Sequence, residues 1–148
     1  AFRHSHTYMG HPTACAAALA VQRAIQDRNL LENVNAQGAA FHKALTERLG
    51  NQPYLGDIRG RGLFFGVELV ADRATKETFD PALHLDHAIK AEAMERGLIC
   101  YPGQGTADGI RGNHILLAPP FIVTGDQVVE IASRVGDAIE AAIEAVRP

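Results

Sequence analysis

Two groups of residues combine side chains that could bind a metal ion. The first holds three histidines, His4, His6 and His11, but has no cysteine or carboxylate at ligand spacing. The second is the segment 84–87, which holds two histidines and an aspartate near a predicted helix start. We interpret the second group as solvated surface residues, and we predict no metal site.

The glycine-rich segment 103–109 could suggest a loop that binds a dinucleotide. Its glycine spacing differs from that fingerprint and no helix follows it directly, so we reject this interpretation. Neither of the two serines, Ser5 and Ser133, lies in a nucleophile elbow. Cys15 lies in an apolar stretch and is interpreted as structural. Taken alone, these residues predict no catalytic centre.

Length and composition are those of an ordinary soluble domain and exclude several classes of protein. The chain has 148 residues and a net charge of -3. The absence of a basic cluster argues against nucleic-acid binding, and no apolar run is long enough to span a membrane. Having only two cysteines fits a reducing compartment, so we expect a cytoplasmic protein. We interpret the start at Ala1, without methionine, as a truncation or processing event.

Two helices are expected in the first third of the chain. Pro12 suits a first helical position, and the stretch 12–21 is apolar on every side, which predicts a helix buried against a partner element. From Leu31 to Leu49, apolar residues recur every three or four positions and predict a second helix. Gly50 then provides the expected C-cap.

Two more helices are expected further along the chain. Apolar spacing over 85–93 predicts a third helix that ends at Gly97. Thr124 and Gln127 have the spacing of a capping box, which predicts the start of a fourth. Apolar residues between 128 and 146 form its expected buried stripe.

The sequence predicts four strands, over 54–62, 63–70, 98–101 and 115–118. It also predicts a mobile loop over 102–113. The order of helices and strands predicts an α+β domain, with a small, mostly antiparallel sheet and helices packed on one face.

Three segments, in order, carry a family resemblance. The first runs from His6-Thr7-Tyr8-Met9-Gly10-His11-Pro12 into the alanine-rich stretch 14–20. The second is 57–64 with Gly66-Val67-Glu68-Leu69, and the third is Ala118-Pro119-Pro120-Phe121-Ile122-Val123-Thr124. They resemble, respectively, the segment after the catalytic lysine, a strand pair of the small domain and the C-terminal strand and turn of class-III aminotransferases. These are pyridoxal-phosphate enzymes of fold type I, and the resemblance covers essentially the whole chain.

The resemblance implies roles for two residues. Thr7 corresponds to a threonine that hydrogen-bonds the cofactor phosphate in the partner subunit's site, and the family therefore implies a homodimer with shared active sites. Arg111 corresponds to an arginine that binds the substrate carboxylate and swings away for substrates without one. On the residues alone, Thr7 would be a helix-start turn and Arg111 an exposed loop arginine. We interpret Arg59 and Arg61 as structural, with Glu68 paired to one of them.

The resemblance also implies what this chain lacks. Pyridoxal 5'-phosphate needs a lysine to bind it covalently, and the three lysines, Lys43, Lys76 and Lys90, lie in polar segments out of position. We therefore expect no catalytic residue here and an inactive chain when it is isolated. Residues 1–30 are expected to be the end of the large cofactor-binding domain with a connecting helix, and 31–148 the C-terminal small domain.

The implied activity is transfer of an amino group from an amine or amino acid to a keto acid such as pyruvate. The same superfamily also contains aminomutases, decarboxylases and racemases, which differ mostly upstream of this segment. A non-catalytic dimerisation or regulatory module is the alternative from another class. The implied partners are small molecules and a second subunit, with no nucleic acid and no membrane.

Overall fold

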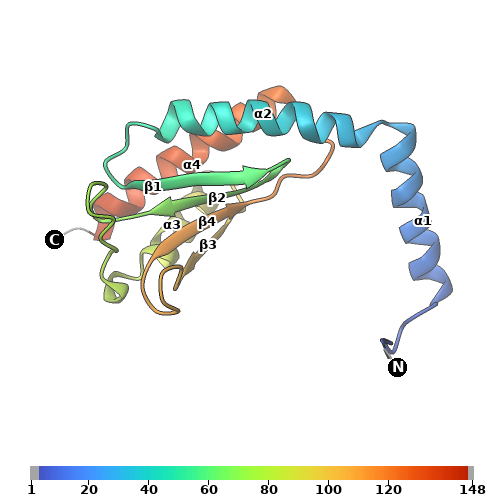
Figure 1. The fold of residues 1–148 in the computed structure, drawn as a ribbon, viewed down its shortest axis with the longest axis horizontal. Coiled ribbons are helices and arrows are strands. Elements are labelled where there is room, and N and C mark those ends of the chain that lie inside the picture. The colour runs from blue at the N-terminus through green and yellow to red at the C-terminus, as the bar shows by residue number, and fades with distance from the viewer. Residues whose placement is uncertain (1–3, 147–148) are drawn as a thin grey trace.

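The computed structural model describes residues 4–146, which form helices, a 3-10 turn and a four-stranded sheet (Figure 1). The helices are α1 (Pro12–Asp27), α2 (Leu30–Leu49), α3 (Leu85–Glu95) and α4 (Gly125–Val146), and the 3-10 turn is Pro81–Leu83. The strands are β1 (Leu55–Arg61), β2 (Phe64–Leu69), β3 (Tyr101–Gln104) and β4 (Asn113–Leu117). In this range no helix is long and apolar enough to cross a membrane.

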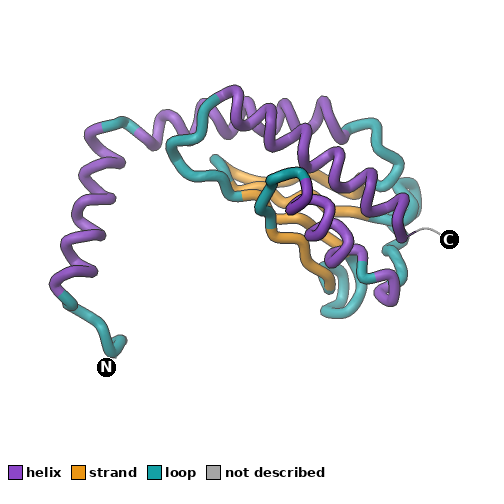
Figure 2. The backbone as a smooth tube through the Cα atoms, turned by 180° about the vertical axis from the view of Figure 1, so that it is seen from behind, coloured by secondary structure: helices purple, strands orange, loops and turns teal. Residues whose placement is uncertain are grey.

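The sheet is antiparallel throughout, and helices cover one of its faces. Its strand order is β1-β2-β4-β3, so the hairpin of β1 and β2 lies beside the hairpin of β3 and β4. Figure 2, seen from behind, shows α3 and α4 in front of the strands. The α+β architecture expected from the sequence, with helices on one face, is confirmed.

Alternation along the two central strands decides which face the helices cover. Phe65, Val67 and Leu69 of β2 are buried, as are Ile115 and Leu117 of β4, while the residues between them point to the other face. Because neighbouring side chains of a strand lie on opposite faces, one face of the sheet is apolar and the other is left open.

The covering helices present the apolar stripes that the sequence predicted. Phe41 of α2 packs edge-to-face on Phe65 of the sheet, with ring centroids 5.4 Å apart. Thr124 and Gln127 form the capping box of α4, in which each backbone N–H is bonded to the other's side chain, at 3.0 and 3.4 Å. The buried stripe of α2 begins at Leu30, whereas Leu31, with which the predicted stripe began, is exposed. Leu30 lies four residues before Val34 and eight before Gly38, on the same helix face.

An ion pair joins α2 to α4 at the rim of this core. Arg48 donates to both carboxylate oxygens of Glu140 at 2.8 Å and to Asp137 at 2.8 Å. The hydrogen bond to Arg48 lowers the pKa of Glu140, so this contact persists at neutral pH. The contact links the two helices beside the apolar stripes that pack in the core.

Helix α1 departs from its prediction. It was expected to be buried, but none of its residues is buried, and Cys15 is exposed. Figure 1 shows α1 extending away from the sheet, with α2 as its neighbour at one end only. The apolar surface of α1 therefore has no covering element in this part of the chain.

The β3–β4 region also differs in its boundaries. A strand was expected over 98–101 and a loop over 102–113, whereas β3 starts at Tyr101 and β4 at Asn113. Gly103 belongs to β3, where a side chain would collide with the ring of His114 across the hairpin. The glycine that suggested a loop is therefore a close-packing position within a strand.

Replacing Gly38 by alanine is expected to destabilise the domain. Helix α2 lies so close to the β1–β2 turn at this point that an added Cβ would stand 2.3 Å from the carbonyl oxygen of Gly62. Overpacking against backbone costs about 1–3 kcal/mol, more than the gain in helix propensity of roughly 1 kcal/mol. Denaturant unfolding should therefore show a lower free energy of unfolding for Gly38→Ala.

Gly125→Ala is the matched control. It makes the same change at the first residue of α4, where the nearest atom to an added Cβ is Gln37 Oε1 at 3.7 Å, an ordinary contact. This variant should be at least as stable as the parent. Equal stability of the two variants would show that the close approach at Gly38 does not constrain the fold.

Candidate functional site

The N-terminal segment forms a tight turn that leads into α1. The backbone N–H of Met9 donates to His6 O at 2.9 Å, and that of His11 donates to Tyr8 O at 3.1 Å. Gly10 adopts a φ of 76°, a left-handed conformation that glycine accepts without strain. The side chain of Thr7 is exposed on this turn.

This turn has donors of the kind that a phosphate group accepts from. Helical hydrogen bonding starts with Cys15, whose N–H donates to His11 O at 3.0 Å. The amides of Thr13 and Ala14 therefore precede the helical ladder. A threonine hydroxyl near a helix N-terminus suits a dianion, because hydroxyl, amides and helix dipole all favour negative charge. The residues present fit the phosphate end of pyridoxal phosphate and no other part of it.

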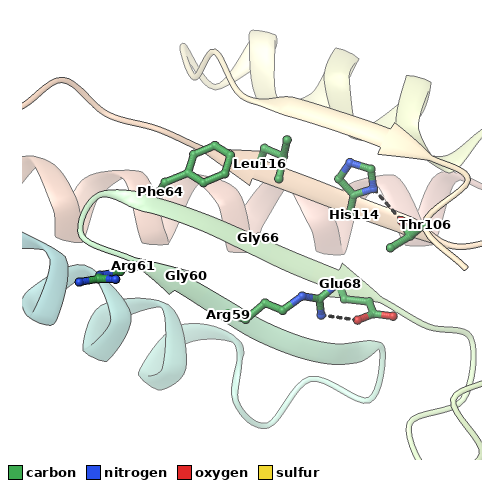
Figure 3. A pocket seen from close by; sticks show the side chains of 9 residues that line it. All are labelled: Arg59, Gly60, Arg61, Phe64, Gly66, Glu68, Thr106, His114 and Leu116. Atoms are coloured by element: carbon green, nitrogen blue, oxygen red, sulfur yellow. Dashed lines mark hydrogen bonds and ion pairs between the residues drawn. The ribbon is translucent and has the colours of Figure 1, made fainter.

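A second feature is a hollow of about 510 Å³ on the open face of the sheet (Figure 3). Its floor is the outward-facing row of the strands. Phe64 is 57% exposed, so the hollow offers an apolar surface beside charged groups. The lining residues are Arg59, Gly60, Arg61, Phe64, Gly66, Glu68, Thr106, His114 and Leu116.

Two charged side chains of this hollow, those of Arg59 and Glu68, are paired with each other. Arg59 donates to Glu68 at 2.6 Å and to Asp57 at 3.0 Å, and these two bonds raise the pKa of Arg59. The expected pairing of Glu68 with one of the two arginines is therefore confirmed for Arg59. His114 Nδ1 lies 2.6 Å from Thr106 Oγ1, which fixes the ring over the hollow.

The third feature is the loop between β3 and β4, which carries Arg111. Its backbone is closed by hydrogen bonds from Gly105 N to Gly112 O at 2.8 Å and from Ala107 N to Arg111 O at 2.9 Å. Arg111 Nε donates to Asp108 Oδ2 at 2.7 Å. The loop is a hydrogen-bonded turn, and its arginine is held in an ion pair.

The Asp108 carboxylate is the centre of this loop. Its other oxygen accepts from the backbone N–H of Arg111 at 2.7 Å and of Ile110 at 3.0 Å. These bonds lower the pKa of Asp108 to about 2, with the backbone N–H of Arg111 as the largest cause. Since the folded pKa is depressed, the carboxylate stabilises the loop above its ordinary pKa near 3.8, and the contribution is lost as pH falls toward 2. The ion pair is therefore intact at neutral pH.

The two residues singled out by the family resemblance are not brought together. Arg111 borders a hollow formed with the segment 76–81 and Ala107, separate from the lining of the open sheet face. Thr7 lies on the N-terminal arm, by which we mean the described segment 4–29 that contains α1. Figure 1 shows this arm at the end of the molecule opposite the β3–β4 loop. Within one chain, the two residues cannot serve one compact site.

The lysines and histidines of the chain form no further centre. Lys43, Lys76 and Lys90 are all exposed. Lys76 donates to Gly56 O at 2.6 Å, and Lys43 pairs with Glu47 within α2. Over residues 4–146, no cluster of three potential ligands could hold a metal ion.

Asp108 was missed by the sequence analysis, and so was the contact of Thr106 with His114. An aspartate followed three positions later by arginine, within a glycine-rich segment, is the local signal of such a turn. The Thr106 contact joins the loop to β4 and has no comparable local signal.

Comparisons with known proteins place this chain in one group. A family model described as aminotransferase class-III matches residues 1–139. An uncharacterized aminotransferase of Schizosaccharomyces pombe is 42% identical over 140 residues, which are 95% of this chain and 30% of that protein. The uncharacterized aminotransferase YodT of Bacillus subtilis is 36% identical over 136 residues, or 92% of this chain and 31% of that protein.

Solved structures agree with these matches. A thermostable (S)-enantioselective omega-transaminase from Thermomicrobium roseum superposes with a TM-score of 0.80 at 34% identity. The superposition covers 100% of this chain and 30% of that one. The chain thus spans less than a third of the length of each of these three proteins.

Proposed function

Because this chain belongs to the class-III aminotransferases, we propose that it is the C-terminal part of a pyridoxal-phosphate-dependent enzyme. That enzyme transfers an amino group from an amine or amino acid to a keto acid such as pyruvate. The observation that carries the proposal is the family match along residues 1–139, combined with coverage of about 30% of the relatives. The omega-transaminase among the similar structures supports an amine as one donor class.

We assign residues 1–30 to the end of the large domain and a connecting helix, and 31–148 to the small domain. The break between α1 and α2 supports this division. Asn29, at the break, has a φ of 49°, so the backbone leaves the helical conformation there and α2 starts in a new direction. The small domain has its own core, whereas α1 contributes no buried residue.

A homodimer with shared sites is the arrangement that we propose. Apolar residues of the arm are exposed, among them Tyr8, Met9, Leu19 and Val21, and a surface of this kind is stabilised by burial in an interface. The placement of Thr7 and Arg111 at opposite ends supports the same arrangement, since Thr7 would then complete the partner's site. The cytoplasmic location stays a prediction.

In the proposed amino transfer, the residues of this chain bind the cofactor phosphate and orient the substrate. The cofactor, when bound, supplies the electron-withdrawing ring on which amino transfer depends. Thr7 donates its hydroxyl hydrogen bond to the phosphate, and the N-terminus of α1 favours the dianion. Arg111 binds the substrate carboxylate through the planar guanidinium, which offers paired N–H donors. The lysine that would move the proton is contributed from outside this chain.

The isolated chain should form no specific adduct with pyridoxal phosphate. Its three lysines are exposed and stand in no cluster with Thr7. Absorbance titration should show no saturable band, and borohydride reduction followed by peptide mapping should find no single modified lysine. A stoichiometric adduct at one of Lys43, Lys76 or Lys90 would contradict the proposal that the cofactor lysine lies elsewhere.

Thr7→Ala should weaken cofactor retention in the full-length enzyme. A hydrogen bond to a charged group contributes about 1.5–3 kcal/mol, which corresponds to roughly a ten- to hundredfold higher dissociation constant for the cofactor. Equilibrium dialysis measures this constant directly. Thr7→Ser keeps the hydroxyl and is the control, which should retain the cofactor like the parent. Unchanged cofactor retention in Thr7→Ala would show that Thr7 is only a turn residue.

Arg111→Ala should impair only substrates that carry a carboxylate. Removing the guanidinium should cost about 2–4 kcal/mol in kcat/KM for pyruvate or alanine, because the partner charge is left unpaired. An aromatic amine without a carboxylate should be affected far less. Single-turnover kinetics of each half-reaction measures the two substrate classes separately. Arg111→Lys keeps the charge without the planar guanidinium, so its kcat/KM for pyruvate should lie between those of the parent and Arg111→Ala. Equal losses for amine and amino acid would refute the role.

A further inference from the structure

One carboxylate controls both the backbone and the side chain of Arg111. Asp108 Oδ1 accepts from the backbone amides of Ile110 and Arg111, and Oδ2 accepts from Arg111 Nε at 2.7 Å. The position of Asp108 Oδ2 is therefore fixed by the turn itself. The arginine side chain is anchored to a point that the backbone defines.

The anchor uses only part of the guanidinium. An arginine has five N–H donors, of which one is on Nε. In the described part of the chain, residues 4–146, the terminal nitrogens Nη1 and Nη2 of Arg111 make no hydrogen bond, and the side chain is 63% exposed. The Nη1–Nη2 edge is thus left available, and this edge has the geometry that a carboxylate binds with two parallel bonds.

Other carboxylates of the same chain border the hollow that Arg111 lines. Glu77 and Asp80 border the same hollow as Arg111. A free arginine side chain samples many rotamers, and immobilising such a side chain on binding lowers affinity by roughly two- to tenfold. A fixed anchor avoids this loss and keeps the guanidinium from pairing across the hollow.

We propose that Asp108 is a positioning residue, which holds Arg111 with its Nη1–Nη2 edge presented to the carboxylate of the substrate. This inference rests on the proposed role of Arg111 and adds to it. It also modifies the expectation that Arg111 swings freely, because movement must first break the bond to Asp108. The alternative role for the Asp108–Arg111 ion pair, stabilisation of the fold, is weak, since an ion pair this exposed contributes little to stability.

The negative charge of Asp108 also repels the incoming carboxylate. That repulsion acts at an exposed site, where the high dielectric constant of water weakens it. We expect the gain from a fixed arginine to exceed this repulsion, and the change in KM of the Asp108 variant measures the net effect.

The test uses the full-length enzyme with Asp108→Asn, Arg111→Ala and the double variant. Asparagine keeps a side-chain oxygen for the two backbone amides and removes the charge that holds Nε. Asp108→Asn should raise KM for pyruvate about three- to tenfold, with kcat nearly unchanged, and should not affect the half-reaction of an aromatic amine. In the Arg111→Ala background it should have no additional effect, because there is then nothing to position.

Asp72→Asn is the matched control. Asp72 Oδ1 accepts from the backbone amides of Ala74 and Thr75, both at 2.8 Å, in a similar surface turn. The arginine of that turn, Arg73, donates to Gly50 O and not to the aspartate. This variant should leave KM unchanged, and thermal unfolding should confirm that both asparagine variants fold.

Three results would overturn the inference in different ways. If Arg111→Ala raises KM for pyruvate selectively but Asp108→Asn does not, Arg111 binds the carboxylate without positioning by Asp108, and only this inference fails. If Arg111→Ala shows no selectivity for carboxylates, the proposed substrate role fails and the inference fails with it. An equal effect of Asp108→Asn with and without Arg111 would assign Asp108 to the turn alone.

Discussion

The sheet can bury only one face within this chain, and the rest of the structure depends on that constraint. Alternation along β2 and β4 directs Phe65, Val67 and Ile115 into the helical layer. Burying them stabilises the fold by about 25 cal/mol for each Å² of apolar surface. The opposite side chains, including Glu68 and His114, are necessarily held on the open face. The hollow there is a consequence of the same alternation that builds the core.

The two residues that we propose to be functional, Thr7 and Arg111, lie outside that core, on two extensions that it holds apart. The arm with Thr7 continues from α2 through α1, and the loop with Arg111 joins β3 to β4 at the opposite end. Each extension has local order of its own: a glycine turn before a helix at Thr7, and the carboxylate of Asp108 at Arg111. A rigid domain that presents both ends suits an assembly in which each subunit contributes to two sites.

Sequence reasoning predicted the parts that depend on local pattern. Apolar periodicity predicted α2 and α4, and the capping box at Thr124 predicted the start of α4. It failed where the outcome depends on distant neighbours. The helix from Pro12 was expected to be buried because burial was inferred from composition, yet the described residues, 4–146, bury none of it. Gly103 looked like a loop residue because its contact with His114 crosses a hairpin. The anchor of Arg111 is a hydrogen-bond geometry that residue types alone do not specify.

A mixed dimer of the full-length enzyme tests the central claim, that the sites are shared, most directly. One subunit would carry Thr7→Ala and the other Arg111→Ala, separated from the parental homodimers by different affinity tags. With shared sites, both defects fall in one site and the other site is intact, so the mixed dimer should show about half the wild-type activity toward pyruvate and retain one cofactor tightly. If each chain completed its own site, every site would carry one defect. Activity no higher than the mean of the two mutant homodimers would then contradict the account.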